Sequence, residues 1–132
     1  MADKKLLVDS SIVIDYLRKG CTKKTVFYRL TRKYKMYVSF LIYAELFAGK
    51  SVWKKKEARN ELEKILSGMT ILFFDNISIA IEAGRIRAEH GLDLVDSVIA
   101  SVAKKEKMVL ATLNSKHFKK VKGLKLVDLK KI

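Results

Sequence analysis

The feature that most limits the fold is a short apolar run, residues 6–8 (Leu-Leu-Val), which ends in Asp9, Ser10 and Ser11. An unbroken apolar run of this length is typical of a strand buried on both faces, although periodicity alone does not separate it from a buried helix. In open parallel α/β sheets, ligands bind just beyond the carboxyl ends of the strands. The sequence therefore predicts that Asp9 forms the first wall of a polar pocket.

Short apolar runs alternate with helical patterns along the rest of the chain. We expect strands at 4–8, 36–38, 70–74, 108–111 and 124–128, and helices at about 11–19 (capped by Ser10 or Ser11), 25–33, 40–48, 52–66, 77–89, 93–105 and 115–119. This alternation predicts an α/β fold with a mainly parallel sheet and helices on both faces. With 132 residues and no linker or repeat, the chain 1–132 is expected to form one domain.

The charge balance points to a polyanionic partner. Lys and Arg number 28 against 14 Asp and Glu, which gives a formal net charge of +14. Nucleic acid, an acidic protein or an anionic membrane surface would each suit this excess, and a Lys-rich solvated surface is the simpler account. No run is long enough to cross a membrane, and Asp9 interrupts the apolar stretch that a signal peptide would need. The single cysteine, Cys21, excludes an intramolecular disulfide and fits a cytoplasmic location.

Glu45 is the only charge in residues 40–48, a helical segment that is apolar all round and is therefore expected to be largely buried. Burying a lone carboxylate costs several kcal/mol unless a cation compensates it. Two explanations of this buried carboxylate remain. Glu45 is either a functional group or a member of a structural ion pair with one of the many Lys and Arg side chains.

Asp96 and Asn114 stand at two further positions of interest. With Asp93 as N-cap, Asp96 is the third residue of a helix, where an acid is also favourable for helix stability alone. Asp96 shares the small-residue side of this helix, which allows close approach to another element, whereas Asp93 is interpreted mainly as a cap. Thr112 and Asn114 follow a predicted strand, although ordinary turn chemistry also explains an Asn there. His117 is a candidate base, and a surface histidine in a basic turn is the alternative.

Together, Asp9, Glu45, Asp96 and Asn114 are expected to converge beyond the ends of the first and fourth predicted strands. Carboxylate and amide oxygens without clustered Cys or His suit a hard divalent cation, Mg²⁺ or Mn²⁺. Like charges share a water-poor site only when a cation holds them. An acidic pocket on a basic protein suggests that lysines hold a polyanionic backbone while the metal acts on one phosphate.

Four segments of the chain resemble the PIN domain family, and within it the VapC-type toxin ribonucleases. These segments are residues 7–11, residues 39–49, residues 96–100 and residues 111–118, in the order and spacing of the family. The resemblance implies a three-layer α/β/α fold and a metal-dependent endoribonuclease, with RNA, a homodimer partner and an inhibitory antitoxin as its partners.

The resemblance also implies a role for each matching residue. Asp9, Glu45 and Asp96 correspond to the family's invariant acids, and Ser11 to a hydroxyl that supports the first. Thr112 is taken as a second supporting hydroxyl. Asn114 stands where many members have a fourth Asp, and this neutral side chain favours one firmly bound metal over two.

Two alternatives come from other classes of protein. A nucleic-acid-binding module with a degenerate site, or a housekeeping relative of the family, would bind RNA in a salt-dependent way without cleaving it. A receiver-type signalling domain also carries Mg²⁺-binding acids, but it needs them at strand ends, whereas Glu45 and Asp96 are predicted on helices. The sequence leaves open the RNA target, the identity of the antitoxin and the choice between a toxin and a housekeeping role.

Overall fold

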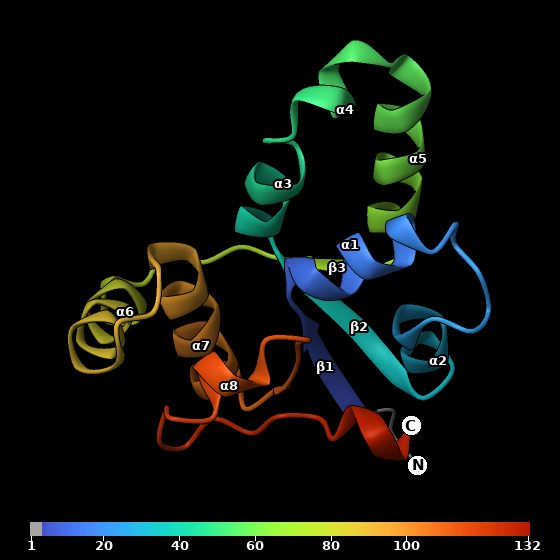
Figure 1. Ribbon diagram of the computed structural model, residues 1–132. Helices are drawn as coiled ribbons and strands as arrows, with labels where there is room; N and C mark the ends of the chain where they lie inside the picture. Colours follow the sequence, from blue (N-terminus) through green and yellow to red (C-terminus); the bar gives the residue numbers. More distant parts are fainter. Residues whose placement is uncertain (1–3) are drawn as a thin grey trace.

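The computed structural model describes residues 4–132, and its centre is a four-stranded parallel sheet (Figure 1). The strands are β1 (Lys4–Val8), β2 (Tyr34–Ser39), β3 (Thr70–Leu72) and β4 (Val109–Ala111), in the order β3-β2-β1-β4. The central strand β1 pairs Leu6 with Met36 of β2 and Leu7 with Leu110 of β4. Because β1 has neighbours on both sides and helices on both faces, its apolar run is fully buried, as predicted.

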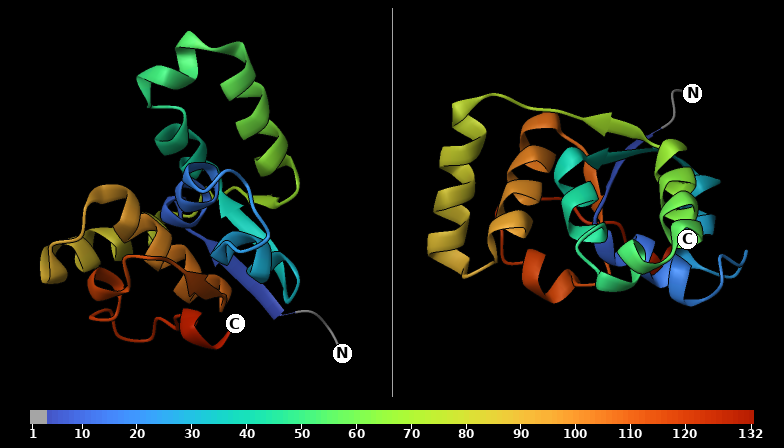
Figure 2. Two further views of the ribbon diagram at one scale, coloured as in Figure 1. Left: turned by 45° about the vertical axis from the view of Figure 1, so that its right-hand side comes forward. Right: turned by 90° about the horizontal axis from the view of Figure 1, so that it is seen from above.

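Helices cover the sheet on both faces, so that the fold has three layers, α/β/α. In the described part of the chain they are α1 (Ser10–Arg18), α2 (Val26–Thr31), α3 (Phe40–Leu46), α4 (Lys50–Lys54), α5 (Lys56–Ser67), α6 (Ile77–His90), α7 (Leu94–Glu106) and α8 (Ser115–Phe118), with a 3₁₀ turn, η1, at Leu129–Lys131. Right-handed crossovers place the connections β1 to β2 and β2 to β3 on one face and the connection β3 to β4 on the other. Figure 2 shows this division, with α1 to α5 on one side of the sheet and α6 and α7 on the other.

The order in which strands are added to the sheet changes direction between β1 and β4. The first two crossovers move outward from β1 to β3, and the third returns past β1 to β4 on the opposite edge. The carboxyl ends of β1 and β4 therefore form the topological switch point, where ligands bind in open α/β sheets. Asp9 follows β1 and Thr112 follows β4, so the fold brings both residues to this point.

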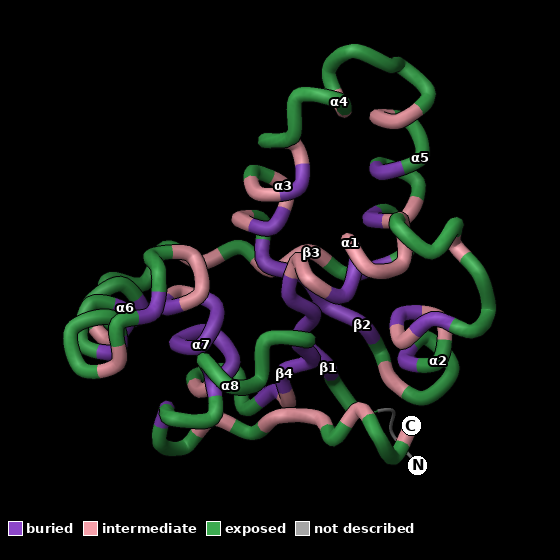
Figure 3. Tube along the Cα trace, in the orientation of Figure 1, coloured by how far each residue is buried: buried purple, intermediate pink, exposed green. Residues whose placement is uncertain are grey.

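The layer of α6 and α7 is joined by a buried hydrogen bond as well as by apolar packing. The hydroxyl of Ser101 on α7 donates to the carbonyl oxygen of Ile79 on α6 at 2.9 Å. Small residues of α7, Ala100 and Ala103, are buried, which lets the helix lie close to its neighbours. Figure 3 shows the contrast with α4, which is mostly exposed and contributes no buried residue.

Two predicted elements differ from the structure. The helix expected at 52–66 is divided into α4 and α5, because Lys55 between them adopts extended backbone angles (φ −126°, ψ 118°). The strand expected at 124–128 is a single parallel bridge between Leu110 and Leu126. Lysines alternate with apolar residues in this segment. Among the described strands, its backbone hydrogen bonds are to Leu110, whose N–H donates to the Lys125 carbonyl and whose carbonyl accepts from the Val127 N–H.

The segment 40–48 is shorter and less buried than its sequence suggests. The helix α3 ends at Leu46, and only Ile42 and Leu46 are buried on it. Phe40 remains 38% exposed and Ala44 is exposed, because α3 packs on the sheet with one side only. The expectation that the whole helix is largely buried is therefore wrong, and Glu45 is a half-buried acid.

Candidate active site

Asp9 is held in place by the first turn of α1 and by the end of β4. Its carboxylate is 3% exposed, accepts a hydrogen bond from the Ser11 amide, and accepts a second from the Thr112 hydroxyl. Asp9 is therefore the N-cap of α1, and the expectation that Ser10 or Ser11 caps this helix is wrong. An acid whose oxygens accept an amide and a hydroxyl bond is fixed in one orientation.

Ser11 and Thr112 join the ends of β1 and β4. The Ser11 hydroxyl accepts a hydrogen bond from the Leu113 amide at 2.9 Å and lies 3.5 Å from the Thr112 hydroxyl. The Thr112 hydroxyl also accepts from the Asn114 amide at 3.0 Å. These bonds hold the polar turn after β4 against Asp9, so both hydroxyls lie where the sequence placed supporting groups.

Asp96 lies in the first turn of α7, close to other acids. Asp93 caps this helix, with its carboxylate accepting from the Asp96 amide at 2.9 Å. Burial raises the pKa of the Asp96 carboxyl to about 7, and the neighbouring carboxylates of Asp93, Asp9 and Glu45 add to the increase. The helix N-terminus that favours an ionised acid here is thus outweighed by desolvation and by like charge.

Glu45 reaches the same region from α3, on the other side of the sheet from Asp96. Burial raises the pKa of its carboxyl, a hydrogen bond from Ser10 opposes this, and the carboxylates of Asp93 and Asp9 raise it further. No ion pair to Glu45 occurs within residues 4–132, so the structural alternative of a compensating Lys or Arg has no support.

The structure therefore brings Asp9, Glu45 and Asp96 into one electrostatic neighbourhood at the carboxyl edge of the sheet. In the described part of the chain, no three acidic, His or Cys side chains lie close enough to hold a metal ion as they stand. The oxygens of these acids are nevertheless the donors that Mg²⁺ and Mn²⁺ prefer. A cation among them would offset the burial and like charge that raise the pKa of Glu45 and of Asp96. The donor set fits a hard divalent cation, provided that the side chains draw together around it.

Asn114 and His117 lie on the open side of this region. The Asn114 amide is bound to Thr112, but its side chain is exposed and makes no cap to α8. His117 is exposed on α8 and makes no side-chain hydrogen bond among residues 4–132. Of the predicted site residues, Asn114 is thus the least constrained, and nothing in the geometry assigns His117 to the site.

Asp93 and Ser10 influence the acids of the site in ways that the sequence did not indicate. Asp93 is a helix cap, as expected, and among the neighbouring carboxylates it is the one that most raises the pKa of both Glu45 and Asp96. Ser10 is not the helix cap, but it lies near Glu45 and lowers the pKa of its carboxyl. The i, i+3 spacing of Asp93 and Asp96 on one helix was the available signal for the first of these, since side chains three apart face the same way.

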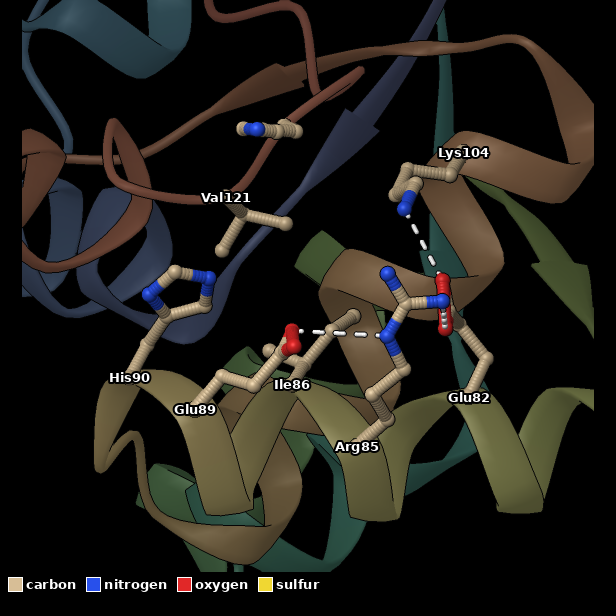
Figure 4. A pocket seen from close by; sticks show the side chains of 8 residues that line it. Glu82, Arg85, Ile86, Glu89, His90, Lys104 and Val121 are labelled. Atoms are coloured by element: carbon tan, nitrogen blue, oxygen red, sulfur yellow. Dashed lines mark hydrogen bonds and ion pairs between the residues drawn. The ribbon is translucent and has the colours of Figure 1, made fainter.

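A pocket of about 360 Å³ lies away from these acids, between α6, α7 and the segment near Val121 (Figure 4). Four of its charged side chains form ion pairs with one another. Lys104 binds Glu82 at 2.9 Å, and Arg85 lies 3.6 Å from Glu82 and 3.4 Å from Glu89. Lys104 lowers the pKa of Glu82 by its hydrogen bond, which is a sign of a structural ion pair. The pocket contains none of the predicted site residues.

Among residues 4–132, no helix is both long and apolar enough to span a membrane.

Comparison with solved structures finds close likeness of fold at low sequence identity. The DNA-bound VapBC from Salmonella typhimurium matches with a TM-score of 0.78 and 23% identity, covering 96% of this chain and 98% of that one. VapBC2 from Rickettsia felis, bound to a DNA fragment from its promoter, gives 0.76 and 24%, covering 93% and 97%. VapBC-1 from nontypeable Haemophilus influenzae gives 0.73 and 24%, covering 96% and 98%. No curated protein sequence matches the chain significantly.

The family model of the PIN domain matches residues 6–124, which include most of β1, all of β4 and every acid discussed above. This family assignment removes the basis for the receiver-domain alternative. The arrangement of a parallel sheet in the order β3-β2-β1-β4, with acids at its carboxyl edge, is accordingly that of a known fold, and the chain belongs to the PIN domain family.

Proposed function

We propose that this protein is a divalent-metal-dependent endoribonuclease and the toxin of a toxin–antitoxin pair. The observation that carries the proposal is the gathering of Asp9, Glu45 and Asp96 at the switch point of the sheet, where burial and then like charge raise the pKa of Glu45 and Asp96. Residues kept in an unfavourable electrostatic state in a cleft or at an edge are candidates for function. The net charge of +14 supports a polyanionic substrate.

In this proposal Asp9, Glu45 and Asp96 hold one Mg²⁺ or Mn²⁺ ion. The chemistry that such an ion supplies is polarisation of a phosphoryl oxygen and a lowered pKa for the water molecule that attacks phosphorus. Ser11 and Thr112 position the site, because their hydroxyls fix the end of β1 and the Asp9 carboxylate. Asn114 contributes a neutral oxygen at its margin, which fits one firmly bound ion better than two.

The test is cleavage of a labelled single-stranded RNA with and without Mn²⁺. We expect Asp96→Asn and Glu45→Gln to abolish product formation while circular dichroism shows an intact fold. Asp75→Asn is the matched control, because it removes an equal charge from an exposed loop. Unchanged cleavage by Asp96→Asn would contradict the assignment, and RNA binding without any product in Mn²⁺ would favour the non-catalytic RNA-binding alternative.

The structures that share this fold include toxin–antitoxin complexes and VapBC proteins, which supports an antitoxin partner for this chain. We expect expression of the protein in bacteria to arrest growth, and the Asp96→Asn variant to leave growth unchanged. A small reading frame directly upstream of the gene should encode a protein that co-purifies with it and restores growth. The single Cys21 is compatible with action in a reducing cytoplasm.

A homodimer is also part of the proposal, supported by exposed apolar side chains on one region of the surface. Phe73 is 74% exposed, Ile77 71% and Ile81 68%, and Phe73 stacks on Phe40 with ring centroids 5.7 Å apart. Apolar patches of this kind on a soluble domain mark contact sites. Ile81→Glu is expected to convert a dimer to a monomer by light scattering, and an unaffected dimer would place the interface elsewhere.

A further inference from the structure

A dense cluster of cations surrounds one exposed tryptophan at the far end of the α3–α5 lobe. We call this the Trp53 site, and it consists of Lys50, Trp53, Lys54, Lys55, Lys56 and Arg59. Five cationic side chains stand against a single acid, Glu57, in residues 50–59. None of the five takes part in an ion pair within the described residues. The lobe projects away from the sheet (Figure 1).

Trp53 is fixed in position although most of its ring is open to solvent. Its indole N–H donates to the Phe47 carbonyl at 2.6 Å, and the Arg59 guanidinium lies 5.5 Å from its ring centroid. Arg59 in turn donates to the Trp53 carbonyl at 3.0 Å and to the Val52 carbonyl at 3.2 Å, which ties α5 to the end of α4. The side chain nevertheless remains 62% exposed. The ring is therefore preorganised as an accessible flat surface.

Core packing does not account for this arrangement. The helix α4 buries no residue, and Trp53 reaches the core only through Phe47, with ring centroids 6.1 Å apart. The indole N–H is already satisfied. Unpaired lysines side by side repel one another, and this repulsion is relieved when a polyanion binds. A partner for this surface must bring negative charge and a flat face that stacks on the indole ring.

We propose that the Trp53 site binds unpaired RNA, with one base stacked on the Trp53 ring and the lysines against neighbouring phosphates. Aromatic platforms beside basic grooves are the physical basis of single-strand recognition, because every base has a π-face and every nucleotide a charge. A base-paired duplex hides its base faces, so it cannot use the ring. The site deepens the proposed ribonuclease function, on which it rests, by adding a substrate-holding surface away from the acids.

The chain places this surface within reach of the strand that occupies the acidic edge. Trp53 follows Glu45 by eight residues, so their Cα atoms are at most about 28 Å apart. Phe47, whose carbonyl accepts the indole N–H, is also the C-cap residue of α3, the helix that carries Glu45. A single-stranded RNA a few nucleotides longer than the scissile step can therefore contact both.

The experiment uses Trp53 as its own reporter, since it is the only tryptophan in the chain. Unlabelled oligouridylate is titrated into the full-length protein in EDTA, which prevents metal-dependent cleavage, and the fluorescence of the indole is followed. We expect saturable quenching by the single strand and little quenching by an RNA duplex of equal length. Binding of a labelled oligouridylate is expected to weaken about 5- to 100-fold in Trp53→Ala, with most of the affinity kept in Trp53→Phe.

The lysines are tested through salt dependence. Replacing Lys54, Lys55 and Lys56 by Gln is expected to reduce the slope of log K against log salt by about 2, since each phosphate contact to a single strand contributes about 0.7. The matched control replaces Lys119, Lys120 and Lys122 by Gln, which removes equal charge from another surface and should leave the quenching of Trp53 unchanged. Thermal unfolding of each variant checks that the fold is intact.

Several outcomes would overturn the inference. RNA binding without quenching, or equal affinity in Trp53→Ala, would show that the ring does not contact RNA. Equal quenching by polyglutamate would assign the site to an acidic protein segment. The two proposals fail separately. If the protein cleaves RNA but Trp53 is not quenched and Trp53→Ala binds RNA normally, only the Trp53 site is refuted. If RNA quenches Trp53 and binds Trp53→Ala more weakly but is not cleaved, only the nuclease activity is refuted.

Discussion

The raised pKa of Asp96 predicts that this acid destabilises the metal-free protein, and that Asp96→Asn makes it more stable. Burial and three neighbouring carboxylates raise the pKa from the ordinary value of 3.8 to about 7. As pH rises from about 4 to 7, the unfolded chain loses its proton while the folded chain keeps it. Stability therefore falls over this range and stays low above pH 7. Asparagine has no proton to lose, so the variant lacks this dependence.

The magnitude follows from the size of the shift. A change of about three pKa units corresponds to an upper limit of about 4 kcal/mol, because each unit is about 1.4 kcal/mol. Asp96 is half-buried, and screening by solvent reduces this to about 2 kcal/mol at pH 8. At pH 5 only the first part of the titration has occurred, so the advantage of the variant should be less than about 1 kcal/mol.

The assay is urea unfolding in EDTA at pH 5 and pH 8, followed by circular dichroism. With a slope of about 2 kcal/mol/M, the midpoint of Asp96→Asn should exceed that of the wild type by about 1 M at pH 8. Asp75→Asn, which changes an exposed loop, should leave the midpoint unchanged at both pH values. A variant that is equally or less stable than the wild type at pH 8 would refute the electrostatic account of the site.

Three further predictions concern single positions. Asp9→Ala removes the acceptor of two hydrogen bonds and should lower the free energy of unfolding by about 1–3 kcal/mol in urea. Lys107 caps α7 with φ +55°, so Lys107→Gly should raise thermal stability by about 0.5–1 kcal/mol, whereas Lys105→Gly within the helix should lower it by about 1 kcal/mol. Burial and a hydrogen bond to Glu61 raise the pKa of the Cys21 thiol from 9.0 to about 11. Its alkylation at pH 8 should thus be about 100-fold slower than in unfolded protein, and Glu61→Gln should restore part of the rate.

The order of strands and helices could be predicted from the sequence because it depends on local patterns. The run at residues 6–8 is a strand buried on both faces, as its short unbroken apolar pattern predicts. Caps such as Asp93 and Ser39 mark the starts of α7 and α3 within one residue. Such signals depend on side chains close in sequence, and they determine most of the fold.

The errors arise where distant contacts decide the outcome. Lys55 has ordinary helix propensity, and only the bonds from Arg59 to the carbonyls of Val52 and Trp53 stabilise the break at that point. The segment 124–128 has the pattern of a strand but meets a single partner residue, Leu110. The exposure of Phe40 depends on which side of α3 meets the sheet, and hydrophobicity along the helix does not specify that side.

For the candidate site, the sequence predicted that Asp9, Glu45 and Asp96 lie at one edge of the sheet, but it did not predict their pKa shifts, and their catalytic role stays a prediction. The convergence of Asp9, Glu45 and Asp96 follows from strand ends and helix starts, which topology brings to one edge. The pKa of about 7 for Asp96 depends on its burial and on the charges facing it from β1, α3 and its own cap Asp93, none of which can be counted from sequence spacing. The lowering effect of Ser10 on the pKa of Glu45 depends in the same way on the packing of α1 beside α3.

The acids of the site differ in what their replacement can reveal. Asp9 is a helix cap whose carboxylate accepts hydrogen bonds from two donors, so its replacement damages the fold. A loss of activity in Asp9→Ala therefore does not by itself separate a catalytic role from a structural one. Asp96 is in the opposite position, since its charge is unfavourable in the folded protein. If Asp96→Asn gains stability and loses cleavage together, structure cannot be the reason that the acid is present. Position 96 is therefore where the proposed activity can be tested independently of the fold.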